Sequence, residues 1–469
     1  MKVRTRFSPS PSGSLHLGNI RTALYCWLYA NKYKGDFILR IEDTDFDRSC
    51  DIYIQNIFDT LNWLGLFWTE GPYYQMKRLD IYNEILKKLL HEGKAYKCYC
   101  KKERLNSLRL FQLKNKMKPK YDKFCRDLKT NLNRSYVVRF KNPDEGNVHF
   151  VDGVYGDIII NNCELDDLII FRSDGIPTYN FVAVIDDIDM KITDVIRGAD
   201  HITNTARQIN IYNSLGVDLP KFYHIPIILN DIGKRLSKRL NSASIIYFHN
   251  SGYLSYSLLN YLLMLGWSYY DKEIFNIDEM IEFFNIEKLH LSSVKFNYKK
   301  LLWYNKYYIR NLSTNYIIEN IVDYLKKINI VLEEGPNISL VFLIQKFRIS
   351  TFLDFIKNNI YFYKRNLFYD SNLNIFIYNK FFLFFDKIYL CLFNNELNWN
   401  ISSLKDLLIK ISVDNNIVLN DLYFFLRIII TGVISSPSLI DVIFLIGKKF
   451  FIYRINCIKY IYKLFINHY

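Results

Sequence analysis

The order of apolar and polar positions at the start of the chain predicts a strand, a helix and a second strand. Residues 2–7 alternate as a short strand, and a Pro-rich turn follows. Apolar residues then recur at helical spacing over 17–28, and Gly35 stands where a helix would end in a left-handed conformation. The apolar run 37–41 predicts the second strand, which opens directly into the acidic run 42–45. This order is typical of a βαβ unit.

The middle of the chain predicts an insertion between two halves of a nucleotide-binding sheet. The pattern of residues changes over 95–172, where a cysteine pair, a basic stretch and short predicted strands appear. Parallel-strand signals then return. The elements expected in this part are helices at 50–65 and 76–92, short strands at 136–140, 149–151 and 158–160, strands at 181–185, 195–196 and 222–229, and a helix at 203–215.

The last part of the chain predicts helices alone. Beyond residue 240 we find only helical periodicity with short breaks, and no internal repeat. The expected fold is an α/β Rossmann-like domain with an α+β insertion, followed by an all-α C-terminal region. The predicted segments are 1–94 and 173–240 for the two halves of the α/β domain, 95–172 for the insertion, and 241–320 and 321–469 for two helical regions.

Composition narrows the class of protein. The chain has 469 residues, half of them hydrophobic and 23% charged, which suits several domains with sizeable cores and excludes general disorder. Polar and charged residues interrupt the most apolar stretch, 376–393, so we expect no membrane-spanning helix. The N-terminus has a Pro-rich turn where a secretory signal would need an apolar block. These features predict a cytoplasmic protein.

The charge balance favours a polyanionic partner. Lysine and arginine outnumber aspartate and glutamate by 61 to 47, a formal net charge of +14. Such an excess favours nucleic acid as a partner, although a basic surface can also serve solubility alone. We interpret the 37 tyrosines and 35 phenylalanines as AT-rich codon bias and core packing rather than base stacking. Eight cysteines over this length do not form a disulfide framework.

Two short motifs carry candidate phosphate chemistry. The tetrapeptide His-Leu-Gly-Asn at 16–19 lies where a turn gives way to a helix, and helix N-termini attract phosphate. The segment Gly-Lys-Arg-Leu-Ser-Lys-Arg at 233–239 places four cations on a loop that can close over a triphosphate and neutralise departing pyrophosphate. Taken alone, each motif is more typical of an ordinary surface histidine or a solvated basic loop.

Together, and split by an insertion, these two motifs resemble the signatures of class I aminoacyl-tRNA synthetases. Further segments resemble glutamyl-tRNA synthetases of the bacterial type, in that family's order and over essentially the whole chain. These segments are 6–13, 19–24, 39–45, 194–201, 302–305, 426–428, 431–432 and 435–437. The resemblance implies that L-glutamate is activated with ATP to glutamyl-adenylate and transferred to the terminal adenosine of tRNA(Glu), in translation.

The resemblance also assigns roles to the segments. It implies a catalytic domain in two halves, with an insertion that binds the tRNA acceptor end. It further implies that 241–320 contacts the tRNA stem and that 321–469 is an all-α anticodon-binding region. A monomer is the expected state. Charging of tRNA(Glu) alone, or of tRNA(Gln) as well, depends on the helices of 320–469, and both stay open.

A glutamate pocket of matched charge follows from the resemblance. Glutamate has two carboxylates and an ammonium group, so its pocket needs at least two cations and one anion. Arg6 and Arg197 have planar forks suited to carboxylates, and Glu42 is the matching anion, although a capping or surface acid is the alternative for Glu42. The resemblance places Ser8, Ser10 and Tyr179 around the amino acid as well. Such a pocket should strongly reject an uncharged analogue.

The activation step is expected to rest on positioning and electrostatics, without a nucleophilic side chain. The resemblance assigns this step to His16, Gly18 and Lys238 with bound Mg²⁺. The implied ATP-binding residues are His16, Gly18, Asn19, Arg235, Leu236, Ser237, Lys238 and Arg239. Asp200 and His201 align near the ATP and amino-acid site, with a structural role equally open for His201.

Three cysteines in the insertion resemble a zinc-binding element found in some members of the family. Cys98 and Cys100 precede Cys125, and thiolates suit Zn²⁺ in closed four-ligand sites. The fourth position, often His in zinc-bearing members, is Asp127 here, with Tyr121 as another oxygen donor. Three free buried thiols are the alternative to a zinc site.

Three other readings compete with this one. Glutaminyl-tRNA synthetases resemble the catalytic half, but their anticodon region is a β-barrel, whereas the tail here is helical. A shorter relative that modifies a queuosine base lacks the tail. A catalytically inactive RNA-binding paralogue would have lost His16, Lys238, Arg6 or Glu42, and all four are present.

Overall fold

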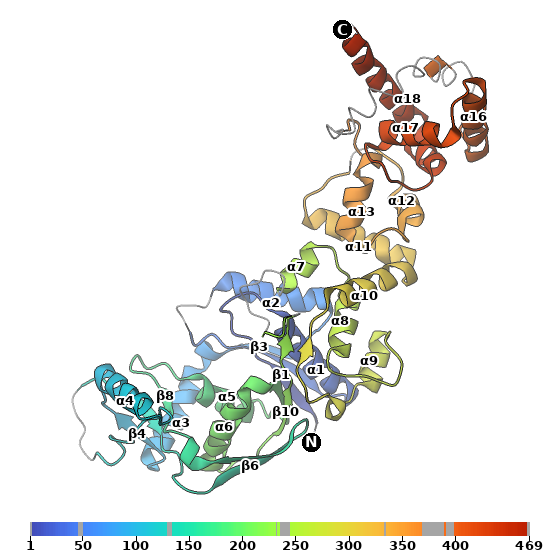
Figure 1. Ribbon diagram of the computed structural model, residues 1–469. Helices are drawn as coiled ribbons and strands as arrows, with labels where there is room; N and C mark the ends of the chain where they lie inside the picture. Colours follow the sequence, from blue (N-terminus) through green and yellow to red (C-terminus); the bar gives the residue numbers. More distant parts are fainter. Residues whose placement is uncertain are drawn as a thin grey trace. The chain divides into compact units, whose positions relative to one another are not determined.

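The computed structural model describes residues 2–45, 50–128, 134–230, 232–234, 244–332, 334–367, 389–390 and 398–466 (Figure 1). The chain forms two compact units. The first comprises Met1–His249 and Ser255–Leu301, and the second Asn250–Leu254 and Leu302–Tyr469. Among the helices within the described ranges, none combines the length and the apolarity that crossing a bilayer requires.

A parallel sheet of three strands, in the order β1-β2-β3, opens the first unit. Its strands are β1 (Arg4–Phe7), β2 (Asp36–Ile41) and β3 (Glu70–Tyr74), connected through α1 (Leu17–Lys32) and α2 (Asp51–Leu64). Strand β2 is buried along its whole length, as its nearly continuous apolar sequence requires. The predicted βαβ unit is confirmed. The sequence pattern gives no sign of β3, whose five residues include a glycine and a proline.

The end of α1 differs from the expectation. The left-handed residue after the helix is Lys34, with φ 50°, rather than Gly35. Gly35 is required for another reason, because a Cβ there would lie 2.2 Å from the carbonyl oxygen of Val3. The chain can therefore pass this close to its first strand only without a side chain.

A second sheet has the strand order β7-β6-β10-β9. Its elements are β6 (Asn147–Asp152), β7 (Gly156–Asn161), β9 (Asp194–Gly198), α6 (Ile202–Leu215) and β10 (Lys221–Ile225). Strands β9, β10 and β6 are parallel, and β7 is antiparallel to β6. Strand β9 lies beside β1, because the amide of Thr193 donates to the carbonyl oxygen of Arg4 at 3.1 Å. The carboxyl ends of β1, β2, β9 and β10 therefore share one edge, where ligands of parallel sheets bind.

The segment 181–185, expected as a strand, is helical, and this prediction is wrong. It forms the middle of α5 (Tyr179–Asp189), and all five of its side chains are buried. A short run of apolar residues that is buried on every side has no periodicity to separate helix from strand. The helix matters for function because it begins at Tyr179 and carries Asp186 and Asp187 into the core.

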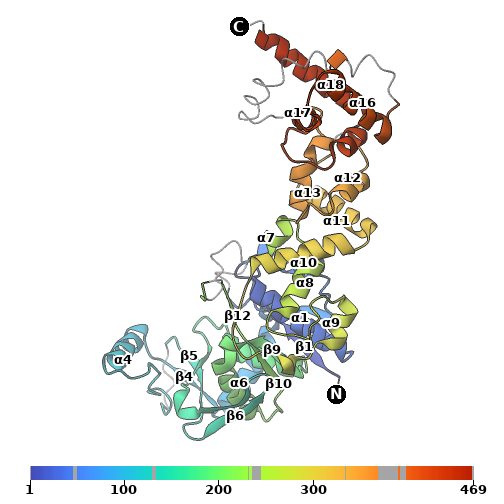
Figure 2. The ribbon, with the colours of Figure 1, turned by 45° about the vertical axis from the view of Figure 1, so that its right-hand side comes forward.

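The insertion has its own antiparallel sheet, in the order β4-β5-β8. Its elements are β4 (Ala95–Cys98), α4 (Lys102–Lys114), β5 (Val137–Phe140) and β8 (Ile169–Phe171), preceded by α3 (Leu79–His91). Figures 1 and 2 both show α4 and β4 set apart from β1 and β10 within the first unit. Strands β6 and β7, also within 95–172, pair with the second sheet instead.

In the rest of the chain, the regular elements of the described residues are helices, as predicted, except for one short strand pair. That pair is β11 (Ile228–Leu229) with β12 (Val294–Lys295). The helices of this part are α7 (Ile245–Asn250), α8 (Ser255–Met264), α9 (Ile277–Phe283), α10 (Tyr298–Asn311), α11 (Thr314–Lys327), α12 (Ile338–Gln345), α13 (Phe352–Asn359), α16 (Ile401–Asp414), α17 (Leu419–Thr431) and α18 (Leu439–Ile466). Helices α8 and α9 pack on α1 and so belong to the first unit, although they follow residue 240.

Candidate active site

His16 caps the N-terminus of α1 through its own ring. Its Nδ1 accepts hydrogen bonds from the amides of Gly18 at 3.1 Å and Asn19 at 3.3 Å. The side chain of Asn19 in turn accepts from the amide of His16 at 3.2 Å, which completes a capping box. Because Nδ1 acts as an acceptor, the ring is neutral here and carries its proton on Nε2. An N–H donor is thereby set at the positive end of a helix.

A cavity of about 260 Å³ opens beside this helix N-terminus. Its lining joins the first signature to residues that follow β9 and β10. The lining residues include His16, Gly18, Asn19, Thr22, Gly198, Asp200, His201 and the run 225–228. A Cβ on Gly18 would lie 3.0 Å from Cε1 of His16, so this position has little room for a side chain.

The second signature lies largely outside the described residues. Arg235, Leu236, Ser237, Lys238 and Arg239 are not placed, but both flanks are. Asn230 and Lys234 close a turn through two hydrogen bonds, of 2.7 and 2.8 Å. On the other side, Ser244 forms a β-bridge with His16. Ser244, the first described residue after the second signature, therefore lies beside the first signature.

Arg6 and Arg40 share one buried carboxylate. Nε of Arg6 lies 3.1 Å from Oδ1 of Asp187, and Nη1 of Arg40 donates to the same oxygen at 2.7 Å. Burial alone would raise the pKa of Asp187, but the two guanidinium groups bring it below its ordinary value. Asp187 is therefore a fixed anion that orients Arg6.

Glu42 follows the end of β2 and faces the same network. Its Oε1 lies 3.6 Å from Nη2 of Arg40, and its side chain is 14% exposed. Burial raises the pKa of Glu42 to about 7, an effect that Arg40 and Arg6 oppose. Because burial makes this carboxylate costly to ionise, a cation beside it, such as the ammonium group of an amino acid, would stabilise its ionised form.

Arg197, at the end of β9, is buried and forms no ion pair with a described residue. It is 6% exposed. Its Nη2 donates to Oγ1 of Thr205 at 2.6 Å and its Nε to Nε2 of His224 at 3.4 Å, and both partners are neutral groups. Among the described residues, no carboxylate oxygen lies within 4.0 Å of this guanidinium group, and burial lowers its pKa. A buried cation with only neutral partners marks a place for an anionic ligand.

Tyr179 stands within electrostatic range of Arg197, Glu42 and Arg6, so four of the six residues expected for glutamate come together. Its hydroxyl meets Nδ1 of His201 at 3.1 Å. Burial, reinforced by Arg197, lowers the pKa of His201 to about 4, so this ring is neutral near pH 7.

The two serines expected around glutamate differ in burial. Oγ of Ser8 is buried and has no hydrogen-bond partner among the described residues. Such an orphaned hydroxyl is costly unless a ligand satisfies it. Ser10 is exposed.

Three of the four expected metal ligands lie together. The sulfur atoms of Cys98, Cys100 and Cys125 all lie within 4.8 Å of one another, and thiolates bound to one zinc ion are separated by about 3.8 Å. The hydroxyl of Tyr121 lies 3.3 Å from Sγ of Cys98 and 3.6 Å from Sγ of Cys100. Asp127 is exposed and outside this group. The donor set, three sulfurs and a phenol oxygen, fits zinc.

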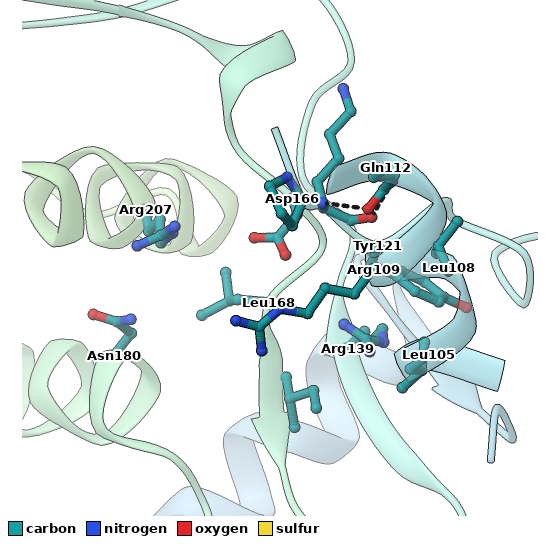
Figure 3. A pocket seen from close by; sticks show the side chains of 13 residues that line it. Leu105, Leu108, Arg109, Gln112, Tyr121, Arg139, Asp166, Leu168, Asn180 and Arg207 are labelled. Carbon is teal, nitrogen blue, oxygen red and sulfur yellow. Dashed lines mark hydrogen bonds between the residues drawn. The ribbon is translucent and has the colours of Figure 1, made fainter. Parts of the chain in front are cut away.

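A second cavity, of about 410 Å³, lies between the insertion and the second half of the α/β domain. Figure 3 shows Arg109 extending from α4 towards the side lined by Asn180 and Arg207. Arg139 also lines it, whereas Asp166 is its only acidic lining residue among those described. Three guanidinium groups around one cavity suit an anion with several oxygens.

Sequence reasoning missed several residues of this site. Asp187, His224 and Thr205 belong to no short motif, and the resemblance assigns no role to Arg40, which lies within the segment 39–45. The available signal was a charge inside an apolar run, since Arg40 interrupts a fully buried strand and Asp187 ends a run of buried residues in α5. A charge kept inside a core is rare unless it is paired.

Comparison with known proteins identifies relatives over the whole chain. The family model described as tRNA synthetases class I (E and Q), catalytic domain, matches residues 2–303, and an anticodon binding domain matches 316–459. A glutamate–tRNA ligase of Buchnera aphidicola subsp. Acyrthosiphon pisum is 45% identical, over 99% of this chain and 100% of that protein. Another, from Buchnera aphidicola subsp. Cinara cedri, is 47% identical over 98% of both.

Solved structures agree with the sequence relatives. The chain is similar to the crystal structure of a glutamate tRNA ligase from Elizabethkingia meningosepticum in complex with its amino acid. The TM-score is 0.82 at 29% identity, and the match covers 97% of this chain and 99% of that one.

Proposed function

The chain belongs to the glutamate–tRNA ligases, a family of class I aminoacyl-tRNA synthetases, and from that membership we propose how its residues divide the reaction. The enzyme charges tRNA(Glu) with L-glutamate in translation, using ATP. Its fold is a class I catalytic domain followed by a helical anticodon-binding domain. The observation that carries the residue-level proposal is Arg197, a buried cation whose described partners are all neutral.

Arg197 binds one carboxylate of glutamate and Arg6 contributes to binding the other, while Glu42 pairs with the ammonium group. Arg6 already shares Asp187 with Arg40, so the pocket holds it in place before substrate arrives. Tyr179 and the unpartnered hydroxyl of Ser8 supply neutral hydrogen bonds. Ser10, which is exposed, stays a prediction.

ATP binds at the N-terminus of α1, in the cavity lined by His16, Gly18 and Asn19. The α-carboxylate of glutamate attacks the α-phosphorus, and pyrophosphate leaves. The proton that His16 keeps on Nε2 makes it a donor to phosphate oxygens. Mg²⁺, expected for a class I synthetase, would neutralise phosphate charge when bound. Lys238, Arg235, Leu236, Ser237 and Arg239 complete the proposed ATP site.

The acceptor end of tRNA(Glu) approaches from the insertion. The cavity with Arg109, Arg139 and Arg207 lies on that side, and Asn180 on its wall is adjacent to Tyr179 of the glutamate pocket. Its guanidinium groups suit backbone phosphates of a single strand. In the second step a ribose hydroxyl of the terminal adenosine attacks the acyl carbon of the adenylate, and AMP leaves.

A zinc ion held by Cys98, Cys100 and Cys125 would give the insertion a structural cross-link. Tyr121 is the nearest oxygen donor to these sulfurs. The site lies in the insertion and takes no part in the proposed chemistry.

Steady-state aminoacylation with varied glutamate tests the proposal. Arg197→Lys should raise the KM for glutamate by roughly 10- to 150-fold, since hydrogen bonds to charged groups contribute about 1.5–3 kcal/mol. Arg172→Lys is the matched control, because Arg172 is 43% exposed and pairs only locally with Asp174. An Arg197→Lys variant with unchanged glutamate KM would remove this residue from the amino-acid site.

A further inference from the structure

Three buried side chains connect Arg197 to the neighbouring strands. Nδ1 of His224 on β10 lies 2.6 Å from Oδ2 of Asp152 at the end of β6. Nε2 of His224 lies 2.8 Å from Oγ1 of Thr205 on α6, and Thr205 accepts from Nη2 of Arg197 at 2.6 Å. Asp152, His224 and Thr205 are between 0% and 1% exposed, so water does not reach the hydrogen bonds between them.

The direction of the hydrogen bonds between these side chains follows from the groups at the two ends of the series, Asp152 and Arg197. Oδ1 of Asp152 accepts from the backbone amides of Val154 at 3.0 Å and Tyr155 at 2.9 Å, which holds the carboxylate in one orientation. Burial would raise the pKa of Asp152, but His224 and these amides bring it below its ordinary value, so Asp152 is an anion. The imidazole proton therefore lies on Nδ1, facing Asp152, and Nε2 presents its lone pair.

The hydrogen bonds on the Thr205 and Arg197 side of His224 agree with a proton on Nδ1. The Thr205 hydroxyl has two acceptors in reach, Nε2 of His224 at 2.8 Å and the carbonyl oxygen of His201 at 3.1 Å, and the nearer is the imidazole. Nε of Arg197 also points at this nitrogen, at 3.4 Å. A proton on Nε2 would face the Nε–H of Arg197, whereas the Nδ1–H tautomer donates to Asp152 and accepts at Nε2, so this tautomer suits the surroundings of His224 best.

The groups that face His224 are Asp152, Thr205 and Arg197, with the rings of Phe150 and Phe222 beside it. Asp200 lies farther away and acts on the imidazole only through its charge.

This arrangement orients Arg197 without neutralising it. Arg6 pairs directly with Asp187, so part of its charge is already used before substrate binds. The anion behind Arg197, Asp152, acts instead only through the neutral side chains of His224 and Thr205. Nη1 of Arg197 has no acceptor among the described residues, and the full charge stays available for a carboxylate.

We propose that Asp152, His224 and Thr205 are positioning residues that set the guanidinium of Arg197 for one carboxylate of glutamate, with His224 held as the neutral Nδ1–H tautomer. The inference rests on the proposed role of Arg197. These residues act through Arg197 and touch no reacting atom.

Asp152→Asn tests the tautomer directly. The three backbone amides, including that of His224 at 3.4 Å, keep the amide oxygen of the new side chain on the Oδ1 side. Its NH₂ group then faces Nδ1, which forces the proton to Nε2 and towards Arg197 and Thr205. We expect the KM for glutamate to rise at least tenfold, while the KM for ATP and kcat at saturating glutamate stay within about threefold.

The same hairpin supplies the control. Asp157 on β7 also bonds a histidine, His149, at 2.7 Å, but both side chains are more than half exposed. Asp157→Asn breaks an Asp–His pair of the same kind and should leave the glutamate KM unchanged. At Thr205, loss of the hydroxyl in Thr205→Val should raise the KM, and Thr205→Ser, which keeps the hydroxyl, should restore it. If Asp152→Asn does not fold, this second pair decides alone.

The outcomes separate the inference from its premise. Unchanged glutamate KM in Asp152→Asn and Thr205→Val, with a raised KM in Arg197→Lys, overturns the positioning role and leaves the proposed function intact. An unchanged KM in Arg197→Lys overturns both. Equal losses in kcat and in both KM values would indicate structural damage and also contradict the proposal. In nitrogen-15 NMR of labelled histidine, the ring of His224 should be neutral with its proton on Nδ1 near pH 7, and a proton on Nε2 of that same ring would contradict the proposal.

Discussion

Single residues of the catalytic domain differ in how their buried charges are compensated. Arg40 is fully buried and has carboxylates on several sides, and Arg6 shares one of them. Arg197 has only neutral partners. Substrate can therefore compensate Arg197 without first breaking an ion pair, which makes this position the one where the charge of glutamate counts most.

Glutamate binding should depend on pH through Glu42. Its pKa of about 7 lies above the ordinary value of 4.5, so the group is mostly ionised at pH 8 and mostly protonated at pH 6. Only the ionised form attracts the substrate ammonium group. We expect the glutamate KM to fall by about tenfold from pH 6 to pH 8, as the ionised fraction rises.

The variant Glu42→Gln provides the control for this pH effect. It should have a high glutamate KM that no longer varies over the same range. His201, with a pKa of about 4, does not titrate there. A wild-type KM that is flat from pH 6 to pH 8 would contradict the assigned role of Glu42.

Asp187 should contribute far more to the free energy of unfolding than Asp189, which lies on the same helix. Replacing it by Asn leaves two buried guanidinium groups without their shared anion, which costs about 3–5 kcal/mol of unfolding free energy. Asp189→Asn is the control, because Asp189 is 51% exposed and its pair with Arg78 contributes about 1 kcal/mol or less. Urea denaturation compares the two variants, and equal losses would contradict the account.

At the scale of elements, helices could be predicted where their apolar residues recur with a clear helical period. Leu17–Lys32 and Ile202–Leu215 have clear helical spacing and were predictable, with ends within a few residues. Helix α5 was not, because its apolar run is buried on every side and its Asp186 and Asp187 are paired by distant arginines. The strand β3 contains Gly71 and Pro72, which are unusual in strands.

The candidate site shows the same division. Motif residues such as His16, Arg6 and Arg197 could be found because they stand in short, ordered segments. The hydrogen-bonded residues Asp152, His224 and Thr205 could not be found from the sequence. They are 72 and 19 positions apart and meet only through the pairing of β6 with β10 and the packing of α6. No local pattern carries that information.

The cysteine element of the insertion should bind one zinc ion per chain. Cys125→Ser should abolish it, whereas Cys163→Ser, at an exposed cysteine, should not. Asp127→Ala should retain the metal because Asp127 is exposed and outside the sulfur cluster, and Tyr121→Phe should weaken binding. Elemental analysis of purified variants measures the stoichiometry. Zinc-free wild-type protein would favour three free thiols.

For the whole molecule, the charge excess and the two family domains point to one polyanionic partner. The formal net charge of +14 predicts that tRNA affinity falls steeply with salt, by at least tenfold between about 50 and 200 mM, because counterions are released on binding. The glutamate KM at saturating tRNA should change much less. Filter binding at several salt concentrations gives the slope, and a flat response would contradict the electrostatic account.

The same purified enzyme can decide the breadth of tRNA selection. Charging of tRNA(Glu) alone indicates a discriminating enzyme. Charging of tRNA(Gln) with glutamate as well indicates that a later amidation step supplies glutaminyl-tRNA.

The most direct test of the account is aminoacylation of tRNA(Glu) with labelled glutamate and, in parallel, with labelled glutamine. A pocket in which Arg197 and Arg6 each contribute to binding one carboxylate should favour glutamate by about 10⁴-fold in kcat/KM, since glutamine has only one carboxylate and would leave one of these buried cations facing a neutral amide. Comparable charging with glutamine, or no charging with glutamate while tRNA still binds, would contradict it.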